Sequence, residues 1–388
     1  MSRLVAVLAH GTTGFVEALR RRWDAGDAVL PVDPRLPAPV RERLLRSVRP
    51  AVLIDPTDGT EAALEGASPP MADGDALVVP TSGTTGEPKG MVLTYDALLA
   101  HARSVHAQLG VTASDRWLAC LPLAHVGGLG VVVRAVLDGI GLDVHHGFDA
   151  DALGAARRAG CTLTSLVPTA LDRLGADGWR WIVLGGSADP VTDRPANVIR
   201  TWGLTETGGG VVYDGRPLPG VEVIAAVEGD LWVRSPTLTR GLRRADGTVV
   251  DHRRTRSDDP TSAGWLPTGD GGEVGVDGTV TVHGRLDDMI VTGGENVWPE
   301  AVEAVLRRHP AVAEVAVTGR PDPEWGQRVV ACVVPTPDAA GPPSLAMLRN
   351  QVRAELPAWC APREIHLVRA LPRTPTGKVR RSDLLPGG

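Results

Sequence analysis

The stretch Pro80–Gly90 has the residue types of a phosphate-binding loop, and it reads Pro-Thr-Ser-Gly-Thr-Thr-Gly-Glu-Pro-Lys-Gly. Its glycines let the backbone approach anionic oxygens, and its hydroxyls and amides can donate hydrogen bonds to them. Lys89 adds a positive charge. A Walker A loop needs GxxxxGK[ST], whereas here Pro88 precedes the lysine and Gly90 follows it. A flexible surface loop would not explain this order of residues, so the stretch predicts phosphate binding outside the P-loop NTPases.

Lysine is rare in this chain. Lysine and arginine together number 40, yet only two of them are lysines, Lys89 and Lys378. Lys378 ends a second Pro, Thr and Gly loop, Leu371–Lys378. A compact ammonium group can enter a tight phosphate or reaction centre as a point charge, which a planar guanidinium does less readily. Because both lysines lie in turns rather than on helical faces, function explains them better than chance retention on the surface.

Two further short motifs end in a carboxylate. Glu206 ends the motif Trp202–Glu206, and a carboxylate oxygen is a ligand that hard cations prefer. Asp270 ends the motif Leu266–Asp270, and a carboxylate there can accept hydrogen bonds. Taken singly, each motif could be an ordinary turn or a helix cap.

In this order, the motifs resemble those of the adenylate-forming superfamily, which includes acyl-CoA synthetases, peptide-synthetase adenylation domains and luciferases. The resemblance extends over nearly the whole chain. It implies that the phosphates of ATP are contacted by Thr81, Ser82, Gly83, Thr84, Thr85, Gly86 and Lys89.

The resemblance also implies a nucleotide site made of residues far apart in the sequence. The implied set is Gly185, Gly186 and Ser187 against adenine, Trp202 and Gly203 beside it, Thr205 on a phosphate oxygen, Glu206 on Mg²⁺, Asp270 on the ribose hydroxyls and Arg285 on ribose or phosphate. Trp202 stands where the family usually has tyrosine. Stacking on the base is therefore kept, but a contact through a tyrosine hydroxyl is lost.

Two half-reactions follow from the resemblance, with ATP, Mg²⁺ and coenzyme A as the implied cofactors. A carboxylate attacks the α-phosphate of ATP, and Lys378 would bridge the two and stabilise the developing charge. The C-terminal domain would then swing about Asp287, remove Lys378 and admit a thiol past Gly293–Asn296 to the acyl carbonyl.

The acid is indicated by two other stretches. Leu121–Leu129 with the later Arg134, and Thr205–Gly215, resemble o-succinylbenzoate–CoA ligases of menaquinone synthesis, in their actinobacterial form. The resemblance implies that His125 lies over the acyl-adenylate, although a histidine that merely ends a strand is the alternative. Arg134 is a candidate for binding a second carboxylate of the substrate, although a helix arginine is more often solvated or structurally paired. The aryl pocket would be lined by Gly128, Gly208 and Gly209.

Three other functions stay open, and the first is another small aryl- or acyl-CoA ligase. A stand-alone adenylation enzyme could pass an aryl or acyl group to a separate carrier protein. Amino acids are disfavoured as substrates because Val126–Gly130 lacks the Asp that usually binds the ammonium group. A nucleotide-binding paralogue without catalysis is the third, and the joint presence of Lys89, Glu206, Asp270, Arg285 and Lys378 argues against it.

The elements that must position these loops alternate in type. Up to about residue 285, β-branched runs such as Ala76–Val79 and Trp181–Leu184 alternate with helical stretches such as Tyr95–Leu109 and Leu129–Leu137. This alternation predicts a large α/β domain over residues 1–285, with largely parallel sheets flanked by helices. Short strands with turns from Val221 onward predict a small β subdomain at its end.

A second domain is expected over residues 286–388. Pro299–Arg308 and Leu345–Leu356 read as helices, and Val312–Thr318 and Arg328–Val334 read as strands. Together they predict a small α+β domain of ordinary size.

Composition limits the partners. The net charge of -6 and pI near 5.9 give no indication of nucleic acid binding, and no apolar run is long enough to span a bilayer. Four scattered cysteines without CxxC spacing suggest thiols in a reducing cytoplasm rather than a disulfide framework or a zinc site. The expected partners are a small carboxylic acid, ATP and CoA, and a homodimer is the default oligomer.

Overall fold

The first sheet of the protein carries the strands that flank the expected phosphate loop. The computed structural model describes residues 2–66, 68–82, 88–186, 194–226, 229–255, 263–337, 341–373 and 379–385. The sheet has the order β17-β16-β6-β5-β2-β1-β3-β4. Its strands are β1 (Leu4–Leu8), β2 (Ala28–Val32), β3 (Val52–Asp55), β4 (Thr60–Ala63), β5 (Asp75–Ser82), β6 (Pro88–Thr94), β16 (Gly241–Arg243) and β17 (Val249–Val250). Strands β5, β2, β1 and β3 are parallel, and the strands beyond them on both sides are antiparallel.

The second sheet has the order β13-β12-β11-β10-β9-β7-β8. Its strands are β7 (Arg116–Ala119), β8 (Gly141–Val144), β9 (Leu163–Leu166), β10 (Trp181–Leu184), β11 (Val198–Leu204), β12 (Gly209–Tyr213) and β13 (Arg216–Pro217). The run from β8 to β11 is parallel, and β12 and β13 are antiparallel to it. The expectation of largely parallel sheets therefore holds for the interior of both sheets, and their edges are mixed.

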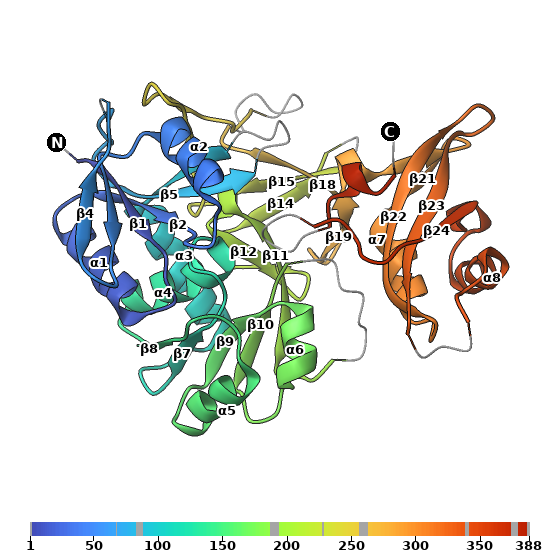
Figure 1. The fold of residues 1–388 in the computed structure, drawn as a ribbon, viewed down its shortest axis with the longest axis horizontal. Helices are drawn as coiled ribbons and strands as arrows, with labels where there is room; N and C mark the ends of the chain where they lie inside the picture. Colours follow the sequence, from blue (N-terminus) through green and yellow to red (C-terminus); the bar gives the residue numbers. More distant parts are fainter. Residues whose placement is uncertain are drawn as a thin grey trace.

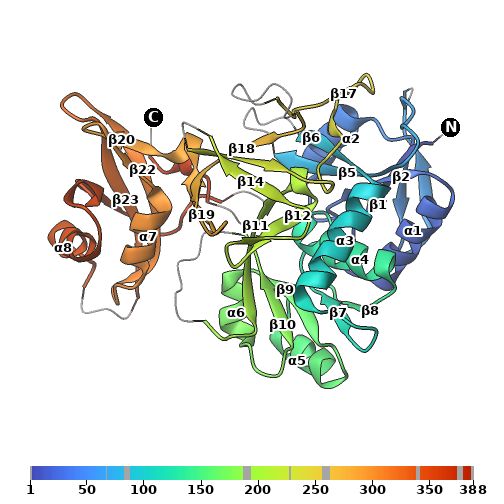
Figure 2. The same cartoon turned by 180° about the vertical axis from the view of Figure 1, so that it is seen from behind.

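Helices fill the space between the two sheets and cover their outer faces. They are α1 (Thr13–Asp24), α2 (Ala38–Val48), α3 (Tyr95–Leu109), α4 (Val126–Asp138), α5 (Ala150–Arg158) and α6 (Pro168–Leu174). Helices α1, α3 and α4 share one apolar core with both sheets, whereas α2 packs on the outer face of the first sheet and α5 and α6 on that of the second. Figures 1 and 2 show α3 and α4 lying between the sheets.

The limits of the two central helices follow from local chemistry. Thr94 caps α3 by accepting a hydrogen bond from the backbone N–H of Ala97, and Gly110 ends the helix in the left-handed conformation. Helix α4 begins directly after His125 and ends at Gly139, also left-handed. The structure thus starts α4 three residues before the expected Leu129, because Gly127 and Gly128 fit a helix that lies against a tight turn.

A third sheet follows, with the antiparallel order β14-β15-β18-β19. Its strands are β14 (Glu222–Ala225), β15 (Asp230–Arg234), β18 (Leu266–Val274) and β19 (Val280–Arg285). The small β unit and its last hairpin are as expected. Strand β18 begins at Leu266, so the Leu266–Asp270 motif lies within a strand and the alternative of an ordinary turn does not hold for it.

The chain after β19 builds a separate core. Its elements are η2 (Leu286–Asp288), β20 (Ile290–Thr292), β21 (Glu295–Val297), α7 (Pro299–Arg307), β22 (Val312–Asp322), β23 (Gly326–Pro335), α8 (Leu345–Glu355), η3 (Ala358–Cys360), β24 (Glu364–Leu367) and η4 (Arg381–Asp383). Helices α7 and α8 pack on the sheet formed by these strands. Figure 1 shows this part, in orange and red, at one end of the molecule.

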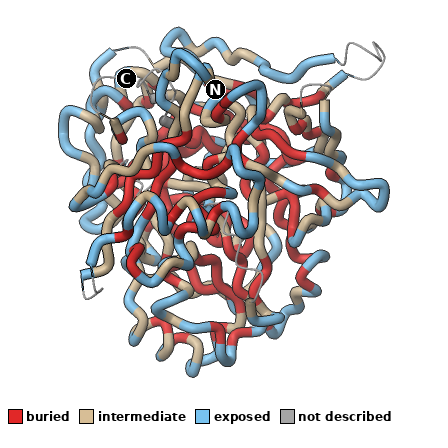
Figure 3. Tube along the Cα trace, turned by 90° about the vertical axis from the view of Figure 1, so that its right-hand side faces the viewer, coloured by how far each residue is buried: buried red, intermediate tan, exposed pale blue. Residues whose placement is uncertain are grey.

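Burial follows the layers. Figure 3 shows that buried positions run through the sheets and the central helices, and that exposed positions lie in loops and on outer surfaces. None of the helices in the described ranges combines the length and apolar character that a bilayer crossing requires.

Candidate active site

The expected phosphate loop is flanked by two antiparallel strands. In β5 and β6, Thr81 pairs with Lys89 and Pro80 pairs with Gly90. A side chain at Gly90 would come within 2.6 Å of Val78, which explains the glycine after the lysine. Of the expected site residues, those that fall outside the described ranges are Gly83, Thr84, Thr85, Gly86, Ser187 and Lys378. The β5–β6 hairpin therefore fixes the two ends of the expected phosphate loop, at Ser82 and Pro88.

Glu206 lies beside this hairpin although it is far away in sequence. Thr205 and Glu206 form the short helix η1 (Thr205–Thr207), directly after β11. The backbone N–H of Thr239 donates to the carbonyl oxygen of Glu206 at 2.7 Å, and its hydroxyl donates to the carbonyl of Val92 in β6, also at 2.7 Å. The two motifs implied for phosphate and Mg²⁺ are thus joined through one threonine.

Trp202, Asp270 and Arg285 converge from three strands. The indole N–H of Trp202 donates to one oxygen of Asp270 at 2.8 Å, and Arg285 donates to the other at 3.0 Å. The family resemblance predicts that Trp202 stacks beside the base, but it does not predict this hydrogen bond. Because a carboxylate has about four lone-pair sites, Asp270 can still accept bonds from a diol. Gly185 and Gly186 follow β10, which is the parallel neighbour of β11.

Asp270→Asn tests the expected ribose contact. The substitution removes the charge that pairs with Arg285 and exchanges one acceptor for a donor. We expect the KM for ATP to rise by about tenfold, because one charge-assisted hydrogen bond is lost, and we expect a smaller change in kcat. Steady-state kinetics against ATP measures this. Asp277→Asn, in the exposed β18–β19 turn, is the control, and an unchanged KM for ATP in Asp270→Asn would contradict the assignment.

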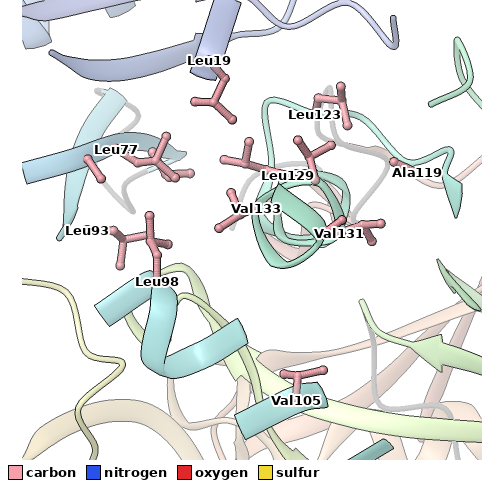
Figure 4. Packing of buried hydrophobic residues seen from close by; sticks show 14 of the residues in the cluster. Leu19, Leu77, Leu93, Leu98, Val105, Ala119, Leu123, Leu129, Val131 and Val133 are labelled. Atoms are coloured by element: carbon pink, nitrogen blue, oxygen red, sulfur yellow. The ribbon is translucent and has the colours of Figure 1, made fainter. Parts of the chain in front are cut away.

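A small apolar cavity lies between α3, α4 and the first sheet. It is lined by Leu77, Leu93, Leu98, His101, Val126, Leu129, Gly130, Val133 and Gly208. Figure 4 shows Leu77, Leu93 and Leu98 facing Leu129 and Val133 of α4. One of the expected aryl-pocket glycines, Gly208, is therefore part of its wall.

The other expected pocket residues lie near this cavity, and each has a different local environment. A side chain at Gly128 would come within 2.4 Å of the carbonyl oxygen of Leu121, so this glycine allows α4 to pack on the preceding turn. Gly209 has φ of +132°, and a side chain there would come within 3.2 Å of the His101 ring. His125 is the residue before α4, and its Nε2 lies 4.0 Å from a carboxylate oxygen of Asp33.

His101 was not indicated by the sequence, because a histidine in an amphipathic helix gives no signal of its own. It is 2% exposed, and its Nε2 lies 3.0 Å from the carbonyl oxygen of Gly210. Burial lowers the pKa of His101 to about 3, and the charge of Arg134 acts in the same direction. The ring is therefore neutral at physiological pH and packs beside Gly208 and Gly209 as an uncharged wall.

Arg134 is neither solvated nor paired with a carboxylate in the part of the chain that the structure describes. It is 4% exposed, and a side chain at Gly130 in the cavity wall would come within 3.2 Å of its Nη1. Its Nη2 donates to the Ser165 hydroxyl at 3.4 Å, and its guanidinium carbon lies 4.8 Å from the centre of the Trp117 ring. Its Nε has no hydrogen-bond partner among the described residues. A buried cation without a counter-charge is costly unless an anion joins it.

The expected hinge lies in η2. Asp287 is followed by Asp288, whose carboxylate accepts a hydrogen bond from Arg381 at 3.2 Å. Across the junction, Trp298 lies 5.6 Å from the His283 ring, and a side chain at Gly271 would run into the Trp298 ring. The C-terminal part therefore docks on the β18–β19 hairpin in this arrangement.

Comparison with known proteins gives the family. The family described as AMP-binding enzyme matches residues 56–284, and the AMP-binding enzyme C-terminal domain matches residues 301–378. A probable 2-succinylbenzoate–CoA ligase of Mycobacterium tuberculosis is 40% identical over 373 residues, with 89% of this chain and 94% of the relative covered. A 2-succinylbenzoate–CoA ligase of Bacillus cereus is 34% identical, with 79% and 69% covered.

Solved structures agree with the sequence relatives. An o-succinylbenzoate CoA synthetase of Bacillus subtilis, in complex with the acyl-adenylate intermediate OSB-AMP, superposes with a TM-score of 0.82 at 27% identity, covering 98% of this chain and 88% of the other. The same enzyme in complex with ATP and magnesium ion gives the same TM-score and identity. The chain belongs to the family of AMP-binding enzymes.

Proposed function

We propose that the protein is an ATP-dependent acid–CoA ligase that works through an acyl-adenylate and whose acid is 2-succinylbenzoate. The reaction converts acid, ATP and CoA into acyl-CoA, AMP and pyrophosphate. The relatives named for this activity and the structural neighbour with bound OSB-AMP support the proposal. The observation that carries the choice of acid is Arg134. A buried guanidinium without a carboxylate partner in the described chain, beside an apolar cavity, suits an acid with a second carboxylate.

The residues divide between the two half-reactions. Asp270 and Arg285 would hold the ribose, the Pro80–Gly90 stretch would hold the phosphates, and Lys378 would meet the reacting carboxylate. We place the domain boundary between residues 285 and 286, with Asp287 as the hinge. The contact of Trp298 with Gly271 and His283 would then have to break when the C-terminal domain rotates.

Glu206 fits the proposed Mg²⁺ ligand. Its side chain is partly exposed and makes no ion pair with any residue in the described ranges, so a carboxylate is available for an oxygen-seeking cation. When bound, Mg²⁺ would offset the negative charge of the phosphates. The contribution of the chain itself is to fix η1 against β6 through Thr239.

The four cysteines support the expected cytoplasmic location. Cys120, Cys161, Cys332 and Cys360 are all free and buried. Burial raises the pKa of the Cys120 thiol to about 11, so this group stays protonated and unreactive at neutral pH.

Pyrophosphate release with a panel of acids, with and without CoA, tests the proposal. We expect release with 2-succinylbenzoate and a thioester product once CoA is added. Two monocarboxylate analogues, 4-oxo-4-phenylbutanoate and 2-butanoylbenzoate, should be used at least tenfold less well, because each lacks one carboxylate. Benzoate and succinate complete the panel.

Each other outcome has a distinct meaning. No pyrophosphate with any aryl or succinyl acid would overturn the choice of acid. Pyrophosphate release without any thioester in the presence of CoA would favour the alternative of an adenylation enzyme that loads a carrier protein. Binding of ATP without turnover of any acid would favour a non-catalytic paralogue.

A further inference from the structure

A chain of hydrogen bonds ends on the aromatic ring beside Arg134. The carboxylate of Asp138 lies 2.6 Å from Nδ1 of His106, and the indole N–H of Trp117 donates to Nε2 of the same histidine at 3.1 Å. The guanidinium of Arg134 lies over the Trp117 ring. Trp117 is fully buried, and His106 is 5% exposed. The series of contacts therefore begins and ends on α4, at Asp138 and Arg134, and passes through α3 and β7.

The donors and acceptors of this chain allow one protonation state. An indole nitrogen can only donate, so Nε2 of His106 must accept and its proton must lie on Nδ1, where it is donated to Asp138. His106 is therefore neutral. Burial also lowers the pKa of His106, with the charge of Arg134 as a further cause, although the bond to Asp138 opposes it. With both ring nitrogens engaged, His106 fixes the rotation of the indole.

An aromatic partner suits a cation that must stay available. A carboxylate against Arg134 would hold it in place but would neutralise the charge and compete with an anionic substrate. The face of an indole attracts a guanidinium and leaves its N–H groups free to donate. Asp138 is the nearest acid in this chain of contacts, and it lies behind the histidine and the indole. The arrangement holds the guanidinium without neutralising it.

We propose that Asp138, His106 and Trp117 position the guanidinium of Arg134 for the second carboxylate of the substrate, so that Trp117 determines specificity without touching substrate. The inference depends on the proposed function. It adds three residues that no motif indicated, since they come from α3, α4 and β7 and become neighbours only in the folded chain.

Trp117→Phe is the first test. It keeps an aromatic face but removes the N–H that bonds to His106. The readout is the ratio of kcat/KM for 2-succinylbenzoate to that for whichever monocarboxylate analogue is turned over. We expect this ratio to fall by about five- to tenfold, the range of one weakened cation–π contact, with the KM for ATP unchanged. His106→Leu should lower the ratio similarly, and His106→Gln, which can still accept and donate, should restore most of it.

The matched control is Trp181→Phe on the same sheet. Trp181 donates its indole N–H to the carbonyl of Leu109 at 3.0 Å, so the substitution also removes an indole hydrogen bond, one that is partly buried. Its specificity ratio should equal that of the wild type. If Trp117→Phe does not fold, His106→Leu and His106→Gln decide the question in the same assay.

The outcomes separate this inference from the proposed function. An unchanged ratio in the folded Trp117 and His106 variants overturns the positioning role. So does an effect of Trp117→Phe that persists in full on an Arg134→Met background, since positioning must vanish with the group positioned. If the wild type itself does not prefer the dicarboxylate, or if Arg134→Met leaves the ratio unchanged, the choice of acid fails instead.

Discussion

Replacing Lys378 with alanine is expected to abolish pyrophosphate release while leaving the reaction of CoA with supplied acyl-AMP close to the wild-type rate. The reason is that one ammonium group would stabilise charge only while the carboxylate attacks the α-phosphate. Loss of a preorganised donor of this kind costs on the order of 10²–10³ in rate. The two halves are measured separately, by pyrophosphate release and by thioester formation from acyl-AMP.

Arg380→Ala is the control for this segment. Arg380 follows Lys378 by two residues and forms an exposed ion pair with Asp383 at 3.2 Å. Loss of the Arg380 side chain should therefore leave the rates of both half-reactions nearly unchanged. Lys89→Ala, the only other lysine variant, should weaken the step that uses ATP as well. An equal loss of both half-reactions in Lys378→Ala would rule out a role confined to one arrangement of the domains.

Arg134→Met should have opposite effects on activity and on stability. Removing one partner of a buried charged pair costs about 3–5 kcal/mol, so kcat/KM for 2-succinylbenzoate should fall on the order of 10²–10⁴-fold. In the absence of ligand, however, the substitution removes a buried cation without a carboxylate partner in the described chain. Replacing such a group by an apolar one of similar shape is neutral or stabilising, so the melting temperature should stay the same or rise by a few degrees.

Arg243→Met provides the matched comparison. Arg243 is buried to the same degree, but it donates to the carbonyls of Val48, Pro69 and Gly247. The same substitution there leaves acceptors unpaired and should lower the melting temperature without changing specificity. Calorimetry and the acid panel on both variants check the contrast. A fall in stability of Arg134→Met as large as that of Arg243→Met would indicate that Arg134 is a structural residue.

Much of the fold could be predicted because local signals agree with the tertiary structure. Helix α3 has the expected limits, Tyr95–Leu109, since Thr94 caps it and Gly110 ends it. Strand β10 also matches. The start of α4 was missed because glycines do not favour helix, and only the packing against Leu121 explains them.

The site was predictable only as far as its motifs reach. The motifs predict Asp270 and Arg285 as site residues, but the bond from Trp202 to Asp270 joins residues 68 positions apart and has no local signal. Nor could the surroundings of Arg134 be predicted, since Trp117, Ser165 and His101 come from three different elements. Periodicity indicates which face of a helix is buried, but not which side chains meet there.

The docking of the C-terminal part on β18 and β19 has a thermodynamic consequence. Trp298 lies against Gly271, next to Asp270, and Glu300 approaches Gly284, next to Arg285. If nucleotide binding shifts Gly271 or Gly284, it changes the free energy of docking. Docking then changes the free energy of nucleotide binding by the same amount. No long pathway between distant sites is then required. The affinity for ATP and the docking equilibrium of the C-terminal part are then thermodynamically coupled, so a change in one changes the other.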